Sequence, residues 1–248
     1  MTHSAPHAVS EASTILVEYR EFPGRSAAST VDAASGAALV LKRGDFVVAV
    51  GGCGSGKSRL VETLAGFAPP PAGDIRIFGR QLSEIRGDDW VEIRRRMGVV
   101  FEMGSRLFPQ MSVLENVILP LRYHLDISAD EAHERVSRML RALGLDKVLH
   151  GLPGRLSREW RPRIALARAL ALEPELLLLD NPLAGLDPEH STWWTTLLAE
   201  MSKGGGPIGP KPMTLLVTAD DCSRWQSAGA TFVHLQRHDP QPFTSGRK

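Results

Sequence analysis

The sequence predicts an α/β fold with a mostly parallel sheet and an inserted helical subdomain. Short apolar runs alternate with amphipathic stretches along the 248 residues, a pattern typical of strand–helix units. Three of the runs are almost continuously apolar, which suits strands that are covered on both faces. Between Glu102 and Trp160 the pattern becomes helical and predicts no strand.

The order of the expected elements along the chain supports this fold. Strands are expected over residues 14–19, 46–50, 74–77, 98–101, 176–179, 214–218 and 231–235. Helices are expected over residues 57–65, 88–95, 113–121, 129–143, 163–172, 188–201 and 222–228. Residues 68–73 end a helix because proline lacks the backbone donor, and residues 203–212 form a Gly- and Pro-rich connection.

The same order predicts one large domain. Residues 1–13 are small and polar, and we expect a flexible tail there without a secretory signal. Residues 14–248 are expected to form a single domain. Within it, residues 14–101 and 161–248 make the α/β core, and residues 102–160 make the helical subdomain.

Composition argues against several classes of function. The chain has 29 Lys and Arg residues against 28 Asp and Glu residues, so it lacks the surplus of positive charge that nucleic-acid binding needs. No run approaches the ~18–20 apolar residues of a membrane-spanning helix. Cys53 and Cys222 have no metal-ligand spacing, so we expect a reducing, cytoplasmic environment without a disulfide framework.

The strongest local signal is a phosphate-binding loop after the run at residues 46–50. Its residues fit G-x-x-x-x-G-K-[ST] and are Gly51, Gly52, Cys53, Gly54, Ser55, Gly56, Lys57 and Ser58. Glycines let the backbone wrap phosphates, while exposed N–H groups and the dipole of the following helix bind the anion. Lys57 would reach the β- and γ-phosphates, and the Ser58 hydroxyl would ligate Mg²⁺. The alternative interpretation is a structural Gly-rich turn, and Cys53 is interpreted as a tolerated small residue rather than a redox group.

Later segments complete an ordered set of motifs. Leu156-Ser157 with residues 163–170 resembles the signature region of ABC-transporter ATPase subunits. Residues 176–180 resemble their Walker B strand, and residues 184–188 resemble their D-loop. The resemblance covers about residues 14–236. A narrower similarity, to the ATPases of MCE/Mla-type lipid transporters and more loosely to general import ATPases, lies in residues 101–108, 115–117 and 120–124.

The resemblance implies a P-loop NTPase (RecA-like) core that works as a nucleotide sandwich. Two ATPase domains would meet head to tail, so that Ser157 in the signature of one contacts the ATP held by the other. It also implies that Asp180 binds Mg²⁺, that Arg59 lies beside the nucleotide and that Phe22 stacks on adenine. Tyr19 competes for the stacking role, and either aromatic could instead belong to the core. The domain would drive an integral-membrane permease from the cytoplasmic face of the membrane.

Two motifs depart from the family at the edges of this sandwich. The Q-loop glutamine is replaced by Glu102, whose carboxylate could still touch Mg²⁺ or its water, or could be tolerated drift. The signature Leu-Ser-Gly-Gly-Gln continues here as Arg158, Glu159 and Trp160, so the glycines that admit the nucleotide are missing. Arg158 could add a positive charge there while its bulk hinders the close dimer. Alternatively, Arg158 and Trp160 belong to a reshaped surface loop without ligand contact.

Two further departures fall on the residues that hydrolyse ATP. Asn181 stands where the family has a general-base glutamate, and an amide has no basic lone pair that could take a proton. General acid–base help is typically worth about 10²–10⁴-fold in rate. Ala219 stands where the family has the H-loop histidine, and loss of one preorganised donor costs roughly 3–4 kcal/mol of transition-state stabilisation.

The sequence therefore predicts an ATP-binding subunit of an ABC transporter, with MCE/Mla-type lipid transport as the candidate system, whose intrinsic hydrolysis is weak or absent. The expected partners are a permease and a second ABC ATPase domain, either in a homodimer or in an asymmetric dimer with an intact ATPase. The alternative function is a catalytically silent, ABC-like regulatory switch.

Overall fold

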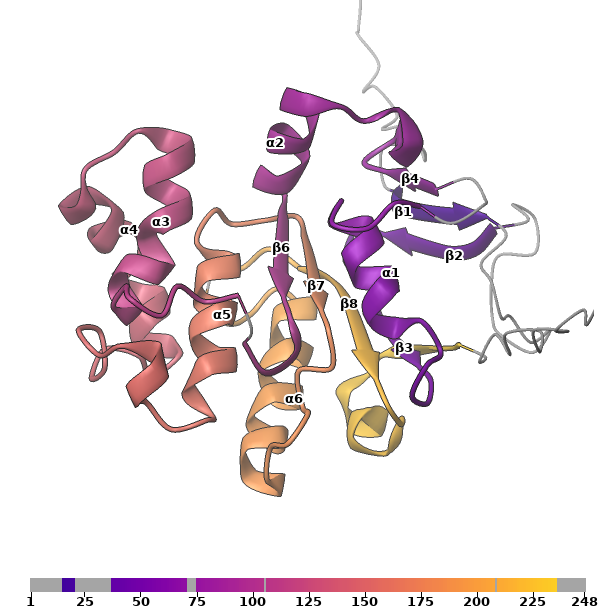
Figure 1. The fold of residues 1–248 in the computed structure, drawn as a ribbon. Coiled ribbons are helices and arrows are strands. Elements are labelled where there is room, and N and C mark those ends of the chain that lie inside the picture. Colours follow the sequence, from indigo (N-terminus) through magenta and orange to yellow (C-terminus); the bar gives the residue numbers. More distant parts are fainter. Residues whose placement is uncertain (1–14, 21–36, 71–74, 105, 208, 236–248) are drawn as a thin grey trace, which may run out of the picture.

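The computed structural model describes residues 15–20, 37–70, 75–104, 106–207 and 209–235, which form two sheets with helices packed on them (Figure 1). The larger sheet is parallel, with the strand order β6-β7-β8-β3-β9, which confirms the predicted α/β core. The smaller sheet is antiparallel, with the order β2-β1-β4-β5.

The element bounds follow the expected order closely. The strands are β1 Ile15–Arg20, β2 Ala37–Lys42, β3 Phe46–Val50, β4 Ile75–Ile77, β5 Arg80–Gln81, β6 Met97–Val100, β7 Leu176–Leu179, β8 Thr214–Ala219 and β9 Thr231–His234. The α-helices are α1 Lys57–Leu64, α2 Gly87–Arg95, α3 Val113–Leu125, α4 Ala129–Ala142, α5 Trp160–Leu170 and α6 Pro188–Ser202. Short 3-10 helices are η2 Leu82–Glu84, η3 Glu102–Gly104, η4 Pro153–Arg155 and η5 Ser223–Ala228.

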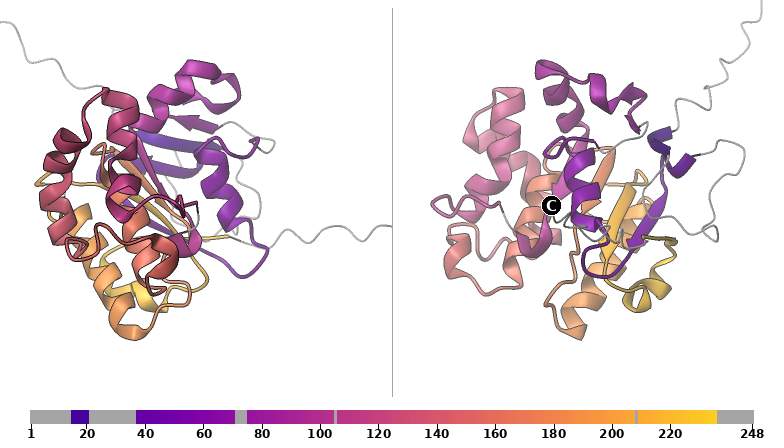
Figure 2. Two further views of the ribbon diagram at one scale, coloured as in Figure 1. Left: turned by 60° about the vertical axis from the view of Figure 1, so that its left-hand side comes forward. Right: turned by 45° about the vertical axis from the view of Figure 1, so that its right-hand side comes forward.

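The central strands are apolar throughout because both faces of the parallel sheet are covered. Along β7, Leu177 and Leu179 pack into the core under α3, α5 and α6, whereas Leu176 and Leu178 pack into the core shared with α1 and the antiparallel sheet. All four leucines have an exposed fraction of 0%. The turned views keep α3 and α4 on one side of the parallel sheet and α1, β1 and β2 on the other (Figure 2). These two cores hold the carboxyl ends of the parallel strands in place.

The segment between Glu102 and Trp160 contains α3 and α4, and its described residues include no strand. A capping box starts α3, in which Ser112 accepts from the Glu115 N–H and Glu115 accepts from the Ser112 N–H. No helix of the described residues could cross a membrane.

The structure corrects three details of the predicted elements. Strands β2 and β5 were not expected; β2 pairs with β1 at the edge of the small sheet, and β5 has only two residues. The helix expected over residues 222–228 is the 3-10 helix η5. The Asp221 carboxylate accepts from the Ser223 N–H at 2.8 Å, and Gly229, with φ of 73°, ends the segment after six residues. Such short, tight segments favour 3-10 geometry.

Candidate nucleotide-binding site

The phosphate loop connects β3, which lies between β8 and β9, to α1. The Gly51 N–H donates to the Ala219 carbonyl at 3.1 Å and so ties the loop to the end of β8. A Cβ on Gly51 would lie 2.9 Å from the Leu235 carbonyl oxygen, closer than real Cβ atoms approach. Gly54 and Gly56 have φ of 79° and 88°, a conformation that other residues rarely adopt. The backbone of this loop therefore requires glycine at these positions.

The outer side of the loop has room and donors for an anion. Gly52 and Gly56 are exposed, and a Cβ on either would meet nothing within 4 Å. The Ser55 hydroxyl is buried without a hydrogen-bond partner in the described part of the chain. The first N–H groups of α1 have no side-chain cap. These features fit a phosphate group; Cys53, in the same loop, is an exposed free thiol.

Lys57, at the start of α1, is 9% exposed. Its ammonium donates to the carbonyl of Gly51 and, at 2.8 Å, to the carbonyl of Gly52. It also forms a 3.1 Å ion pair with Asp220, a residue that the sequence prediction did not include. The ammonium is thereby held against the loop, where it could meet the β- and γ-phosphates of a nucleotide.

Asp180, directly after β7, is the centre of a hydrogen-bond network behind the loop. It is 4% exposed, and its Oδ1 accepts from Ser58 Oγ at 3.1 Å and from Thr218 Oγ1 at 2.8 Å. Thr218 Oγ1 accepts in turn from the Asn181 N–H at 2.9 Å, although the sequence prediction did not include Thr218. The structure thus brings together Ser58 and Asp180, whose hydroxyl and carboxylate oxygens are suitable ligands for Mg²⁺.

Asn181 and Ala219, which stand where the resemblance predicts hydrolytic residues, lie beside this network. Asn181 has φ of 43°, a left-handed conformation in which asparagine is enriched, and its Nδ2 donates to Asp220 Oδ2 at 3.2 Å. Ala219 is the last residue of β8, is 3% exposed and offers only a methyl group. The described site therefore has an amide donor at one position and no polar side chain at the other.

In the signature loop, residues 156–160, the serine hydroxyl is hydrogen-bonded within the loop. Ser157 is exposed, and its hydroxyl donates to the carboxylate of Glu159. This hydrogen bond is the main reason why the pKa of Glu159 lies below its usual range. The Arg158 guanidinium packs over the D-loop, where a Cβ on Gly185 would lie 3.4 Å from its Nη2. The loop thus presents bulky, charged side chains where the family has glycines.

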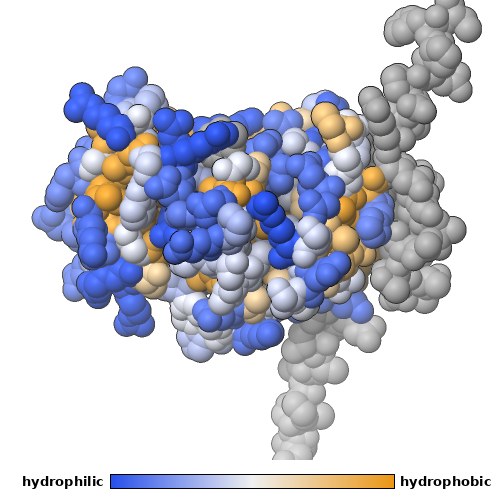
Figure 3. Space-filling model, turned by 90° about the horizontal axis from the view of Figure 1, so that it is seen from below, coloured by the Kyte–Doolittle hydropathy of each residue, from blue (hydrophilic) through white to orange (hydrophobic). Residues whose placement is uncertain are grey.

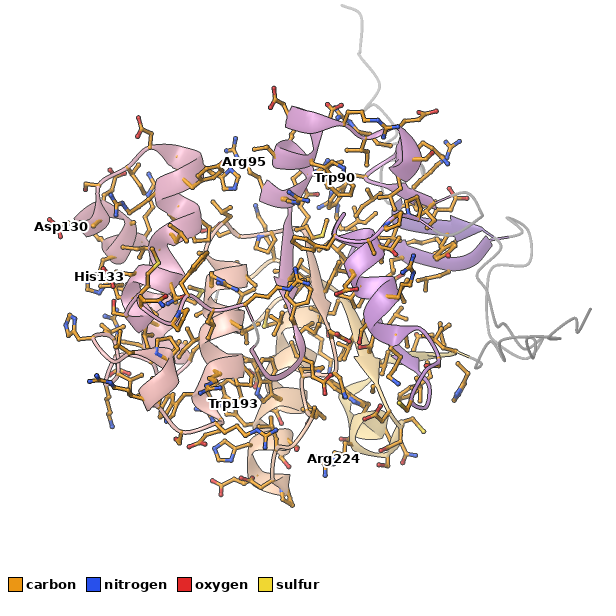
Figure 4. The ribbon with its side chains drawn as sticks, viewed as in Figure 1. Trp90, Arg95, Asp130, His133, Trp193 and Arg224 are labelled. Atoms are coloured by element: carbon orange, nitrogen blue, oxygen red, sulfur yellow. The ribbon has the colours of Figure 1, made fainter. Side chains whose placement is uncertain are left out.

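The Arg163 side chain packs against two tryptophan rings next to this loop. The Arg163 guanidinium lies 4.0 Å from the ring centre of Trp193 and 5.5 Å from that of Trp160, and burial lowers its pKa. Figure 4 shows Trp193 at the end of the molecule opposite Trp90 and Arg95. Seen from below, polar residues cover most of this end, and the apolar residues form separate patches between them (Figure 3).

The other predicted site residues are not part of the network around Asp180. Glu102, in η3, is exposed, and among the described residues it makes no hydrogen bond to Ser58 or Asp180. Arg59 is exposed, and its guanidinium reaches the Pro69 carbonyl at 3.5 Å. Tyr19 is 2% exposed, and burial raises its pKa, so it is a core residue rather than a stacking platform. Phe22 lies outside the described residues.

Comparisons with known sequences agree with this geometry. The family model described as ABC transporter matches residues 35–184. The intermembrane phospholipid transport system ATP-binding protein MlaF of Escherichia coli (strain K12) is 34% identical over 168 residues, which are 68% of this chain and 62% of MlaF. The methionine import ATP-binding protein MetN of Lactobacillus delbrueckii subsp. bulgaricus is 33% identical over 184 residues, 72% of this chain and 52% of MetN. The matched part is therefore less than two thirds of either relative.

Solved structures share most of this fold. The dimeric structure of MJ0796, a bacterial ABC transporter cassette, has a TM-score of 0.73 at 26% identity and covers 90% of this chain and 95% of its own. The structure of cbiO1 from Clostridium perfringens, part of the ABC transporter complex cbiONQ, has a TM-score of 0.70 at 25% identity, with coverages of 90% and 86%. Since the family model matches more than half of the sequence, this chain belongs to the ABC transporter family.

Proposed function

We propose that this chain is an ATP-binding subunit of an ABC transporter that binds Mg-ATP at its phosphate loop and hydrolyses it slowly or not at all. One contrast carries the proposal. Ser58 and Asp180 are hydrogen-bonded to each other beside Lys57, whereas the positions next to them lack the groups that activate water. Binding and hydrolysis depend on different residues here, so one can persist without the other.

Binding would be shared between backbone and side chains. The N–H groups of the loop and of α1 would surround the phosphates, with Lys57 at the β- and γ-phosphates. Ser58 and Asp180 would hold Mg²⁺, which neutralises phosphate charge when it is bound, and Glu102 is a further candidate ligand. Stacking of Phe22 on adenine and a nucleotide contact from Arg59 also belong to the proposal. Ser157 would face the nucleotide of a partner domain.

Hydrolysis would be slow because no side chain at the family's base position can accept a proton. Asn181 uses its Nδ2 to donate to Asp220, and the amide has no basic lone pair. The loss of general-base help costs about 10²–10⁴-fold in rate. Ala219 removes a second contribution, and losses within one catalytic unit do not add simply.

The proposed assembly is a head-to-tail dimer with a second ABC ATPase domain. This chain's phosphate loop would then face the partner's signature, while Ser157, held by Glu159, would face the partner's nucleotide. An intact ATPase as partner would leave ATP clamped at this chain's loop and confine turnover to the partner's loop. The dimeric MJ0796 structures support dimerisation. A homodimer that works as a nucleotide-gated switch is the second form of the proposal.

The proposed membrane partner is a permease that docks on the cytoplasmic face beside the helical segment. A cavity of about 620 Å³ lies there, between α2, α3, α4 and the connection from α5 to β7. Its lining combines apolar and charged side chains, among them Leu121, Leu125, Leu172, Arg95, Arg135 and Glu173. The similarity to MlaF supports a phospholipid as the transported substrate, and the comparable similarity to MetN supports a small imported solute.

Calorimetric titration of the purified chain with Mg-ATP tests the binding half. We expect saturable binding that Lys57→Ala weakens by ~10–100-fold, because a hydrogen bond to a charged group contributes about 1.5–3 kcal/mol. Lys203→Ala, which removes an exposed lysine at the end of α6, is the matched control and should bind like the wild type. Absence of binding by the wild type, or equal binding by Lys57→Ala, would overturn the proposal.

Purification from membranes tests the transporter half. A permease retained with the wild-type chain supports a transport function. A chain that binds ATP but retains no integral-membrane protein supports the regulatory switch instead.

A further inference from the structure

The Lys57 ammonium has as many oxygen contacts as it has protons. The described residues supply the carbonyls of Gly51 and Gly52 and the Asp220 carboxylate, at 3.1 Å from Nζ. A lysine ammonium has three donors and no acceptor. A phosphate oxygen can therefore gain a hydrogen bond from Lys57 only if one of these contacts is released. Asp220 is the contact that can leave, since its side chain is 65% exposed and the carbonyls belong to the loop itself.

The Asp220 carboxylate is held in this position by Asn181. Its second oxygen, Oδ2, accepts from Asn181 Nδ2 at 3.2 Å. A glutamate at position 181 would bring a second carboxylate to this contact, and like charges so close repel each other. The amide at position 181 and the carboxylate against Lys57 are therefore physically coupled. The amide at position 181, which cannot act as a base, also helps to keep the Asp220 carboxylate beside the phosphate loop.

We propose that Asp220 is a built-in competitor for the nucleotide and sets the preference of this site between ATP and ADP. The inference rests on the proposed binding of ATP at this loop. In the free chain the Asp220 carboxylate occupies the contact that Lys57 would offer to the β- and γ-phosphates. ATP adds a γ-phosphate, and so more negative charge, next to the displaced carboxylate. Asp220 therefore disfavours ATP more than ADP, and in the free chain its carboxylate is paired with the Lys57 ammonium.

The adjacent residue provides a matched control. Asp221 carries the same charge one position further along, but its Oδ1 accepts from the Ser223 N–H at 2.8 Å and from the Ser223 hydroxyl. Asp220→Asn and Asp221→Asn thus make the same change in net charge, and only the first removes the ion pair with Lys57. Asp220→Asn also keeps an oxygen that can accept from Asn181, so the geometry of the loop is preserved.

The experiment titrates Mg-ATP and Mg-ADP into the wild-type chain, Asp220→Asn and Asp221→Asn at low and high salt. Asp220→Asn should bind ATP about fivefold more tightly than the wild type, the upper range for an exposed charge pair, and ADP by a smaller factor. The gain should shrink as salt rises, because exposed charges are screened. Asp221→Asn should match the wild type with both nucleotides.

The outcomes separate this inference from the proposed function. Equal ATP affinity in Asp220→Asn and Asp221→Asn, or weaker ATP binding in Asp220→Asn, overturns the inference and leaves ATP binding intact. Failure of all three chains to bind either nucleotide overturns both.

Discussion

The phosphate loop and the signature loop each contain a serine hydroxyl, and the two hydroxyls are used in different ways. Ser58 donates to Asp180, which also accepts from Thr218, so residues from α1, from the end of β7 and from β8 align one another. Ser157 donates to Glu159, two residues further on in its own loop. The first arrangement depends on the fold of this chain, whereas the second is a hydrogen bond within one loop. The groups proposed to bind nucleotide are thus held by contacts between elements, whereas Ser157 is held within its own loop.

The glycines show the same contrast. In the phosphate loop, Gly54 and Gly56 keep a backbone conformation that other residues rarely adopt. In the signature loop, Arg158 and Glu159 occupy the positions at which the family has glycine. Predictions that break or sharpen the contrast can be ranked by their expected size.

The largest effect is expected for Asp180→Asn. An amide keeps a hydrogen-bond acceptor for Ser58 but loses the charge that would attract Mg²⁺. Titration with ATP in the presence and absence of Mg²⁺ measures the change, and we expect the affinity gained from Mg²⁺ to fall by ~10–100-fold. Unchanged Mg²⁺ dependence would show that Asp180 does not hold the metal.

The next effect concerns the stability of the network. Thr218→Ala removes the hydroxyl that joins Asp180 to the Asn181 N–H, so the buried Asp180 and the half-buried Asn181 each lose a hydrogen bond. We expect the free energy of unfolding to fall by about 2 kcal/mol. Thr218→Ser keeps the hydroxyl and should lose only the contribution of one methyl group, about 0.8 kcal/mol. Denaturant unfolding compares the two, and equal losses would exclude a role for the hydroxyl.

A smaller effect tests the signature loop. The double variant Arg158→Gly/Glu159→Gly restores the two glycines, frees Ser157 and leaves Trp160 in its packing position. Sedimentation with Mg-ATP should show self-association about tenfold tighter than in the wild type, which corresponds to ~1.4 kcal/mol. If the double variant and the wild type associate equally, Arg158 and Glu159 do not limit self-association.

The smallest effect is expected at Glu175, which lies away from both loops and serves as a control for stability without a change in binding. Glu175 precedes β7 at the end opposite Asp180, and hydrogen bonds from Arg96 and then Arg43 hold its pKa below the usual 4.5. A carboxylate with a lowered folded-state pKa stabilises the protein above its unfolded-state pKa, and this stabilisation disappears as the pH falls through the folded-state pKa.

Glu175→Gln should therefore reduce the free energy of unfolding at pH ~7 by about 0.2–1 kcal/mol, the range for partly exposed pairs. Wild type and variant should converge in denaturation measured well below pH ~4.5. The affinity for Mg-ATP at neutral pH should not change. A loss of ATP affinity would mean that stability and binding are coupled along β7.

Much of the fold could be predicted from local patterns. The bounds of β3 and β7 match the expected ones because a strand buried on both faces is a continuous apolar run. Strand β2 was missed because its register is set by pairing with β1 and not by its own pattern. Helix α5 begins at Trp160, earlier than expected, since Pro162 is tolerated in a first turn whose N–H groups have no partner inside the helix.

The site was predictable where a motif is continuous in sequence, and at Asp180, which the family resemblance supplied. The phosphate loop is one continuous motif, and its geometry follows from its glycines. Thr218 and Asp220 were missed because the contacts of these residues join segments far apart in the chain. Thr218 is separated by 38 positions from Asp180. The usable signal was their place at the end of β8, since the carboxyl ends of neighbouring parallel strands meet at one edge of the sheet.

The central claim is that this site holds ATP without splitting it, and the fate of bound nucleotide tests that most directly. An excess of the purified chain is mixed with Mg-ATP labelled at the γ-phosphate, and the bound label is followed as ATP or phosphate, with Lys57→Ala as the reference. We expect the wild-type chain to retain intact ATP while Lys57→Ala retains little. Rapid release of labelled phosphate by the wild type, absent in Lys57→Ala, would contradict the account.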